Sequence, residues 1–180
     1  SWHLSRSLVA DEFDITMCQE MTLDHGVMSI LPLVTETPWK VKVVPLAVNV
    51  ILHPLPSVRR CWRLGEALAR GIESFSVDER VVVMATGGLS HQLQGADFGF
   101  LNPEWDEEFL DRVEKDPQSL LDLTHDELMD RGGAEGVEVI MWLAMRGALR
   151  GRQRRVQRNY WAPVLTGYGL LALEPEAPGG

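Results

Sequence analysis

One short apolar segment constrains the fold of this chain more than any other feature. Residues 80–85 read Arg-Val-Val-Val-Met-Ala and end at Thr86-Gly87-Gly88. A continuous apolar run of this length, bounded by a turn, is typical of a strand covered on both faces. A second apolar, β-branched run over residues 41–51 is broken by Pro45, which predicts a strand that leads into a loop.

Helical patterns surround these two runs. Ser57 is placed to cap one helix, and Thr124 with Glu127 forms a capping box for another. A last strand is expected over residues 169–173, and the basic stretch 150–158 is expected to be a solvated loop because it is short and the chain is acidic. The expected helices cover the first ten residues, residues 58–75, the stretches that follow Asn102, Asp116 and Thr124, and residues 134–149. This alternation predicts a layered α/β fold with a central, mostly buried sheet and flanking helices.

Composition and charge exclude several classes of protein. The chain has 180 residues, 45% of them apolar, which is enough for one domain with a sizeable core and excludes a disordered tail. Its formal charge of -9 argues against nucleic acid or an anionic membrane as a partner and leaves a small molecule or another protein. Only Cys18 and Cys61 are present, without a CxxC motif, and neither a signal peptide nor an apolar run of about 20 residues occurs. We therefore expect a cytoplasmic protein.

Glu138 is the most informative single residue. It lies in Val137-Glu-Val-Ile-Met-Trp-Leu-Ala-Met145, a helical segment that is otherwise apolar. Because an uncompensated buried charge costs several kcal/mol, this carboxyl group should be protonated, paired with a cation or bound to a metal. A salt bridge to a core arginine and a contact near the start of the helix both remain possible. Glu135 lies in the first helical turn and is expected to be an exposed partner of the helix dipole.

Two histidines are candidates for chemistry. His91 follows the apolar run 80–85, and ligands of α/β sheets bind beyond the carboxyl ends of the strands, so His91 is placed for acid–base work or metal binding. Neither GxxxxGK[ST] nor GxGxxG occurs, which argues against a phosphate loop. The alternative for His91 is a loop histidine bonded to backbone carbonyls, and for His25, in Leu23-Asp-His-Gly26, a simple turn. The three other histidines, His3, His53 and His125, are expected to be surface or structural residues.

Three motifs together resemble one family. They are Gly-Gly-Leu-Ser-His-Gln-Leu-Gln-Gly around His91, Asp-His-Gly around His25, and Gly-Ala-Glu-Gly-Val-Glu-Val-Ile-Met-Trp around Glu138. From Ser1 to about Ala148 the chain is similar to the class III extradiol ring-cleavage dioxygenases, the family of the protocatechuate 4,5-dioxygenase beta subunit. Further matching segments lie at residues 44–50, 60–65 and 102–106.

The resemblance implies a non-haem Fe(II) centre held by two histidines and one glutamate. Glu138 matches the glutamate ligand, His91 the acid–base histidine, and His25 a second active-site histidine near the substrate or oxygen. The two histidine ligands are expected upstream of Ser1, so the resemblance implies that the N-terminal part of the domain is missing and that residues 1–180 alone are inactive. It also implies extradiol cleavage of a catecholic acid of the protocatechuate or gallate type by dioxygen, a homo- or hetero-oligomer, and a possible small alpha-type lid subunit.

The resemblance leaves some points open. Residues 1–174 are expected to form the partial catalytic domain, and residues 175–180 a flexible tail. After Pro163 the chain lacks the Ser-Asn-Thr stretch that lies near the substrate in the family, so the ring substituent of the substrate stays open. The alternative function is a non-catalytic homologue or fragment that acts as a binding or assembly module. A zinc hydrolase is less well supported because no HExxH motif occurs.

Overall fold

The computed structural model describes residues 1–50 and 52–176. It contains helices and strands, which confirms the mixed α and β class. In chain order the elements are α1 (Trp2–Ala10), α2 (His25–Met28), α3 (Leu31–Val34), α4 (Val58–Glu73), α5 (Pro103–Lys115), the 3-10 helix η1 (Pro117–Leu120), α6 (His125–Gly132), the 3-10 helix η2 (Glu135–Val139), α7 (Ile140–Gly147), β1 (Gln153–Trp161) and β2 (Tyr168–Pro175).

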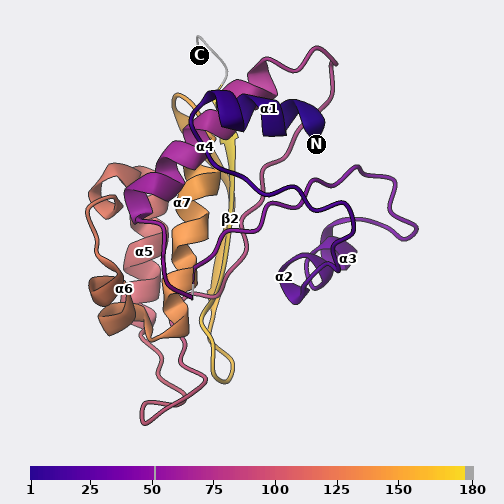
Figure 1. The fold of residues 1–180 in the computed structure, drawn as a ribbon. Coiled ribbons are helices and arrows are strands. Elements are labelled where there is room, and N and C mark those ends of the chain that lie inside the picture. The colour runs from indigo at the N-terminus through magenta and orange to yellow at the C-terminus, as the bar shows by residue number, and fades with distance from the viewer. Residues whose placement is uncertain (51, 177–180) are drawn as a thin grey trace.

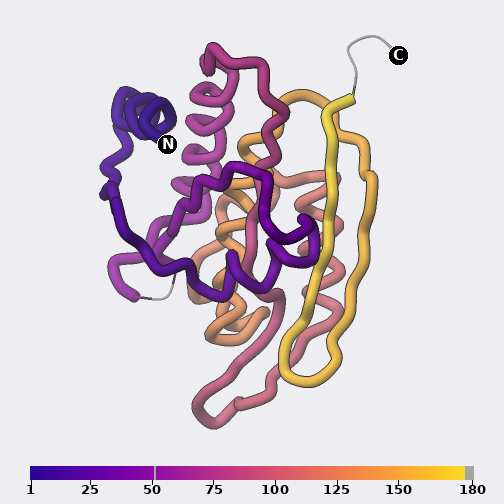
Figure 2. Tube along the Cα trace, turned by 90° about the vertical axis from the view of Figure 1, so that its right-hand side faces the viewer, coloured from indigo at the N-terminus to yellow at the C-terminus, as the bar shows by residue number. Residues whose placement is uncertain are grey.

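A layer of helices and a β-hairpin form the body of the molecule. Helix α4 packs on α7, α1 packs on α4, and α5 contacts both strands of the hairpin (Figure 1). The main core is built largely from α5 and α7, including Phe109, Leu110, Ile140 and Leu143. Figure 2 shows the two strands running side by side along the helices. Helices α2 and α3 stand apart from the helical layer in Figure 1.

Side-chain caps start three of the helices where the sequence predicts them. Ser57 accepts a hydrogen bond from the Arg60 amide at 3.1 Å and begins α4. Asn102 begins α5, and Thr124 begins α6 through a complete capping box. Each cap satisfies a backbone amide that has no partner within its own helix.

The helix expected over residues 134–149 is broken into two different elements. Its first part is the 3-10 helix η2, and α7 follows it directly. Gly136 lies within η2, where a Cβ atom would be 3.3 Å from the Leu89 carbonyl oxygen. A tighter 3-10 turn is common at the start of an α-helix, and here it lies against the loop that precedes His91.

The prediction of two central strands is wrong for the described residues. Residues 41–50 and 80–85 carry no strand, and Ile51, the end of the first run, lies outside the description. Val82 is 70% exposed, whereas a strand covered on both faces would be buried. β-branched composition favours a strand only where a neighbouring backbone pairs with it. Instead of a central buried sheet, residues 1–50 and 52–176 contain one antiparallel sheet of two strands, β1 and β2.

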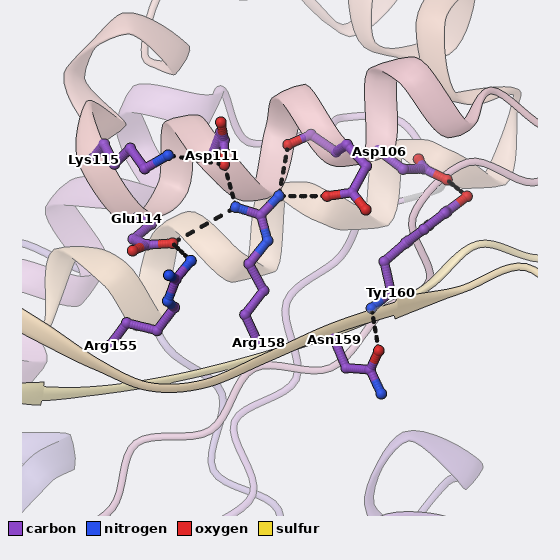
Figure 3. Close-up of polar contacts among 9 residues, drawn as sticks. Asp106, Asp111, Glu114, Lys115, Arg155, Arg158, Asn159 and Tyr160 are labelled. Atoms are coloured by element: carbon purple, nitrogen blue, oxygen red, sulfur yellow. Dashed lines mark hydrogen bonds and ion pairs between the residues drawn. The ribbon is translucent and has the colours of Figure 1, made fainter.

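The prediction of a solvated loop over the basic stretch 150–158 is also wrong, because residues 153–158 belong to strand β1. Arg158 pairs with Asp111 and Glu107 on α5, and Arg155 lies 3.2 Å from Glu114 (Figure 3). The positive charges therefore meet acidic partners on the neighbouring helix, which charge counting along the chain does not reveal. The last predicted strand is confirmed and extends to Tyr168–Pro175. Of the predicted tail, residues 177–180 lie outside the description.

No helix in the described ranges is both long enough and apolar enough to cross a membrane.

Candidate active site

The Gly87-Gly88 turn is the backbone segment that Glu138, Trp142 and the His91 ring all approach. Gly87 has a φ of +117°, a conformation that side chains disfavour and glycine adopts easily. Its carbonyl oxygen accepts a hydrogen bond from the Trp142 indole at 3.1 Å. The Gly88 amide donates to Oε2 of Glu138 at 3.2 Å. The turn is thus fixed against η2 and α7.

Glu138 is half-buried in η2 and has no cationic partner among the described residues. The salt bridge considered from the sequence is therefore absent there. Arg146, the buried arginine of α7, instead donates from Nε to the Val113 carbonyl oxygen at 3.0 Å. The Gly88 amide occupies only Oε2 of Glu138, so the carboxylate retains lone pairs on Oε1 for a further ligand.

His91 also lies close to Gly88. The ring is 6% exposed, and its Nδ1 atom is 2.8 Å from the Leu89 carbonyl oxygen. A Cβ atom built on Gly88 would lie 2.9 Å from Cε1 of this ring. The backbone contact considered as the alternative for His91 is thus present, and its acid–base role stays a prediction. That bond assigns the Nδ1 proton as donor, which leaves the Nε2 lone pair of the neutral ring available to accept a proton.

His25 begins the short helix α2. Asp24 caps this helix by accepting a hydrogen bond from the Val27 amide at 3.3 Å, so the Asp-His-Gly motif is a helix start rather than a simple turn. A Cβ atom on Gly26 would lie 3.0 Å from Oγ1 of Thr86, which places the start of α2 beside the glycine turn. The His25 side chain is exposed and makes no hydrogen bond within the described residues.

Two other histidines serve the packing of helices, as expected. Nε2 of His3 is 2.8 Å from the Gly71 carbonyl oxygen, at the end of α4. Nε2 of His125 is 2.9 Å from the Pro56 carbonyl oxygen, in the segment before α4. His53 is exposed.

Two acidic residues near the candidate site, Asp106 and Glu135, are more buried than the sequence indicates, and both accept hydrogen bonds from the backbone around His91. Asp106 is completely buried and accepts hydrogen bonds from the amide and the hydroxyl of Ser90, both at 2.7 Å. Glu135, expected to be an exposed dipole partner, is half-buried and accepts a hydrogen bond from the Leu93 amide at 3.1 Å. Asp106 stands in a strongly acidic helix, where nothing in the local sequence distinguishes a buried carboxylate from exposed ones.

The described residues contain no group of three or more histidine, cysteine, aspartate or glutamate side chains placed to hold a metal ion. Glu138 combines partial burial, a carboxylate without a cationic partner among the described residues, and a position beside Gly88, which the His91 ring also approaches. The donor set thus fits one position, the carboxylate, of a two-histidine and one-carboxylate metal site.

Comparison with known proteins identifies the family. Residues 1–169 match the family described as the catalytic LigB subunit of aromatic ring-opening dioxygenase, and the chain belongs to this family. The resemblance inferred from the motifs is therefore confirmed.

Several enzymes are similar to this chain. It is 47% identical over 178 residues to a gallate dioxygenase of Pseudomonas putida strain KT2440, an alignment that covers 97% of the chain and 52% of that relative. It is 26% identical over 221 residues to a 2,3-dihydroxyphenylpropionate/2,3-dihydroxicinnamic acid 1,2-dioxygenase of Xanthobacter autotrophicus, covering 96% of the chain and 70% of the relative. The chain thus spans about half the length of the gallate dioxygenase.

Proposed function

We propose that this chain is part of a non-haem Fe(II)-dependent extradiol dioxygenase, which uses dioxygen to open the ring of a catecholic aromatic acid. The observation that supports this most directly is the approach of Glu138 and His91 to one residue, Gly88. A carboxylate that has no cationic partner within residues 1–50 and 52–176 and a histidine with its Nε2 lone pair available are the two kinds of group that such a reaction requires.

Each candidate residue has a proposed role. Glu138 would hold the ferrous ion, together with two histidines upstream of Ser1. The iron, when bound, supplies the redox chemistry and a template for the substrate. His91 would accept the proton of a ring hydroxyl at Nε2, since histidine is the side chain that most often performs such proton transfers in enzymes. His25, beside the glycine turn, would contact the substrate or the oxygen region.

The names of the relatives support the choice of substrates to test. Gallate is the first compound to test because the relative at 47% identity is named a gallate dioxygenase, and protocatechuate is the second. We also propose a cytoplasmic, oligomeric enzyme that acts in the catabolism of aromatic compounds, with or without a small lid subunit.

Oxygen uptake by the product of the complete gene tests this function. The purified protein is loaded anaerobically with Fe(II) and then supplied with gallate, protocatechuate or 2,3-dihydroxyphenylpropionate. We expect oxygen consumption equal to the substrate consumed, with loss of the aromatic absorbance. A protein that binds no iron and consumes no oxygen with any of the three would instead support the alternative, a non-catalytic binding or assembly module.

A further inference from the structure

Asp106 is a completely buried carboxylate for which the proposed reaction has no direct use. It lies on α5, while its helix neighbours Glu104 and Glu107 are exposed. Burying a carboxylate costs several kcal/mol unless hydrogen-bond donors or a cation compensate it. No lysine or arginine pairs with Asp106 among the described residues, so its donors supply the compensation.

Three donors converge on this carboxylate. The amide of Ser90 donates to Oδ1 at 2.7 Å, and the Ser90 hydroxyl donates to Oδ2 at 2.7 Å. The Tyr160 hydroxyl donates to Oδ2 at 2.8 Å, a contact that Figure 3 shows. Burial, together with the hydrogen bond to Asp106, raises the pKa of Tyr160. The phenol therefore remains a donor throughout the neutral pH range.

The backbone that carries His91 is held at successive positions. The amides of Leu89 and His91 donate to backbone carbonyls at 2.8 and 2.7 Å. Between them, the Ser90 amide donates to a side chain, that of Asp106. The Ser90 hydroxyl also accepts a hydrogen bond from the Asn102 amide at 2.8 Å, which ties the start of α5 to the same point. Asp106 thus fixes the residue immediately before His91.

We propose that Asp106 and Tyr160 are positioning residues for His91. They act through Ser90, whose backbone sets where the His91 ring lies relative to Gly88 and Glu138. This inference rests on the proposed acid–base role of His91. Because a displacement of about 1 Å at a reacting group can cost about 100-fold in rate, loosening Ser90 should reduce turnover without removing any group that touches the substrate.

The test uses Asp106→Asn in the complete, iron-loaded protein. The amide keeps the size of the side chain but replaces one acceptor oxygen with a donor, so it cannot accept all three hydrogen bonds. We expect kcat to fall about 10- to 100-fold while KM changes little. We also expect faster hydrogen exchange at the Ser90 and His91 amides, with unchanged exchange in α4. Asp111→Asn, on the same helix but in contact with Arg158 and Lys115, is the matched control and should change neither quantity.

Tyr160→Phe provides a second variant in case Asp106→Asn does not fold. It removes one of the three donors and should lower kcat by about two- to ten-fold, the effect of one hydrogen bond, with faster exchange at the same two amides. A lower melting temperature in both variants, with kcat and exchange matching the Asp111→Asn control, would overturn the positioning role.

The exchange measurement separates this inference from the proposed function. If the wild-type protein opens no ring, the proposed function is wrong and with it any catalytic use of His91. Unchanged exchange at Ser90 and His91 in an active Asp106→Asn variant would sink the positioning role alone.

Discussion

Gly88 has no side chain, and this allows two functional groups to approach the same backbone position. Glu138 accepts its amide hydrogen, and Cε1 of the His91 ring lies 2.9 Å from where a Cβ atom of residue 88 would stand. The contact between Nδ1 of His91 and the Leu89 carbonyl oxygen further orients the ring. The same residue that serves the local structure of the loop can therefore also serve proton transfer at Nε2.

Replacement of His91 by alanine should separate these two roles. In the complete protein we expect His91→Ala to retain iron and to lose about 10²- to 10⁴-fold in kcat, the usual contribution of acid–base assistance. Metal analysis beside steady-state oxygen uptake checks both quantities. Loss of the metal on this substitution would make His91 a ligand, which would contradict the role assigned to it here.

Among the secondary-structure elements, the β-hairpin makes ion pairs with the helical layer that its sequence alone does not indicate. Arg158 is the most enclosed arginine of β1, with its side chain 16% exposed, and it pairs with carboxylates of α5. Arg154, on the same strand, is 64% exposed and pairs with Glu174 of the other strand. The first arginine joins the hairpin to the helical layer, and the second only joins the strands to each other.

Removing these two arginines should therefore have unequal effects on stability. We expect Arg158→Met to lower the free energy of unfolding by about 1 to 2 kcal/mol, since it removes charge-assisted hydrogen bonds between an enclosed arginine and α5. Arg154→Met, the matched control, should cost less than about 1 kcal/mol because its ion pair is exposed. Urea denaturation measures both values. Equal losses would show that the α5 contacts do not anchor the hairpin.

The same contacts should weaken in acid. Hydrogen bonds from Arg158 and Lys115 hold the pKa of Asp111 below its ordinary value. A carboxyl group with a lowered folded-state pKa stabilises the fold above its unfolded pKa of about 3.9, and this contribution is lost as the pH falls through the lower folded value. We expect wild-type protein to melt above Asp111→Asn at pH 7 and the difference between the two melting temperatures to shrink as the pH falls below about 4. A constant difference across this range would argue against a role for the charge.

For the molecule as a whole, local signals predicted the capped helices well, missed the short helices α2 and α3, and predicted the sheet poorly. Caps at Ser57 and Thr124 depend on residues three positions apart, so the sequence contains the whole interaction. Strand pairing depends on distant backbone, and for that reason the apolar run 80–85 was misassigned while β1 was missed. In the candidate site, too, local features were predictable and features that depend on distant residues were not. The motifs indicated Glu138, His91 and their glycine turn, whereas the burial of Asp106 depends on packing between α5 and the hairpin.

The described donor set also predicts how residues 1–180 behave on their own. In the proposed facial triad Glu138 would supply one ligand of three, so this segment alone should bind Fe(II) weakly and open no ring. Anaerobic iron titration followed by an oxygen-uptake assay checks this. Tight, stoichiometric iron together with turnover would show that the ligands expected upstream of Ser1 are not needed.

Glu138→Gln in the complete protein tests most directly whether this residue is the iron ligand. The amide preserves size and packing while removing the charge, and a neutral amide is cheaper to bury than an unpaired carboxylate. Iron titrations are made beside thermal melts of the metal-free protein. We predict loss of iron binding and activity with an unchanged or higher apo melting temperature. Unchanged iron affinity with a marked drop in that temperature would contradict the assignment and the dioxygenase chemistry proposed from it.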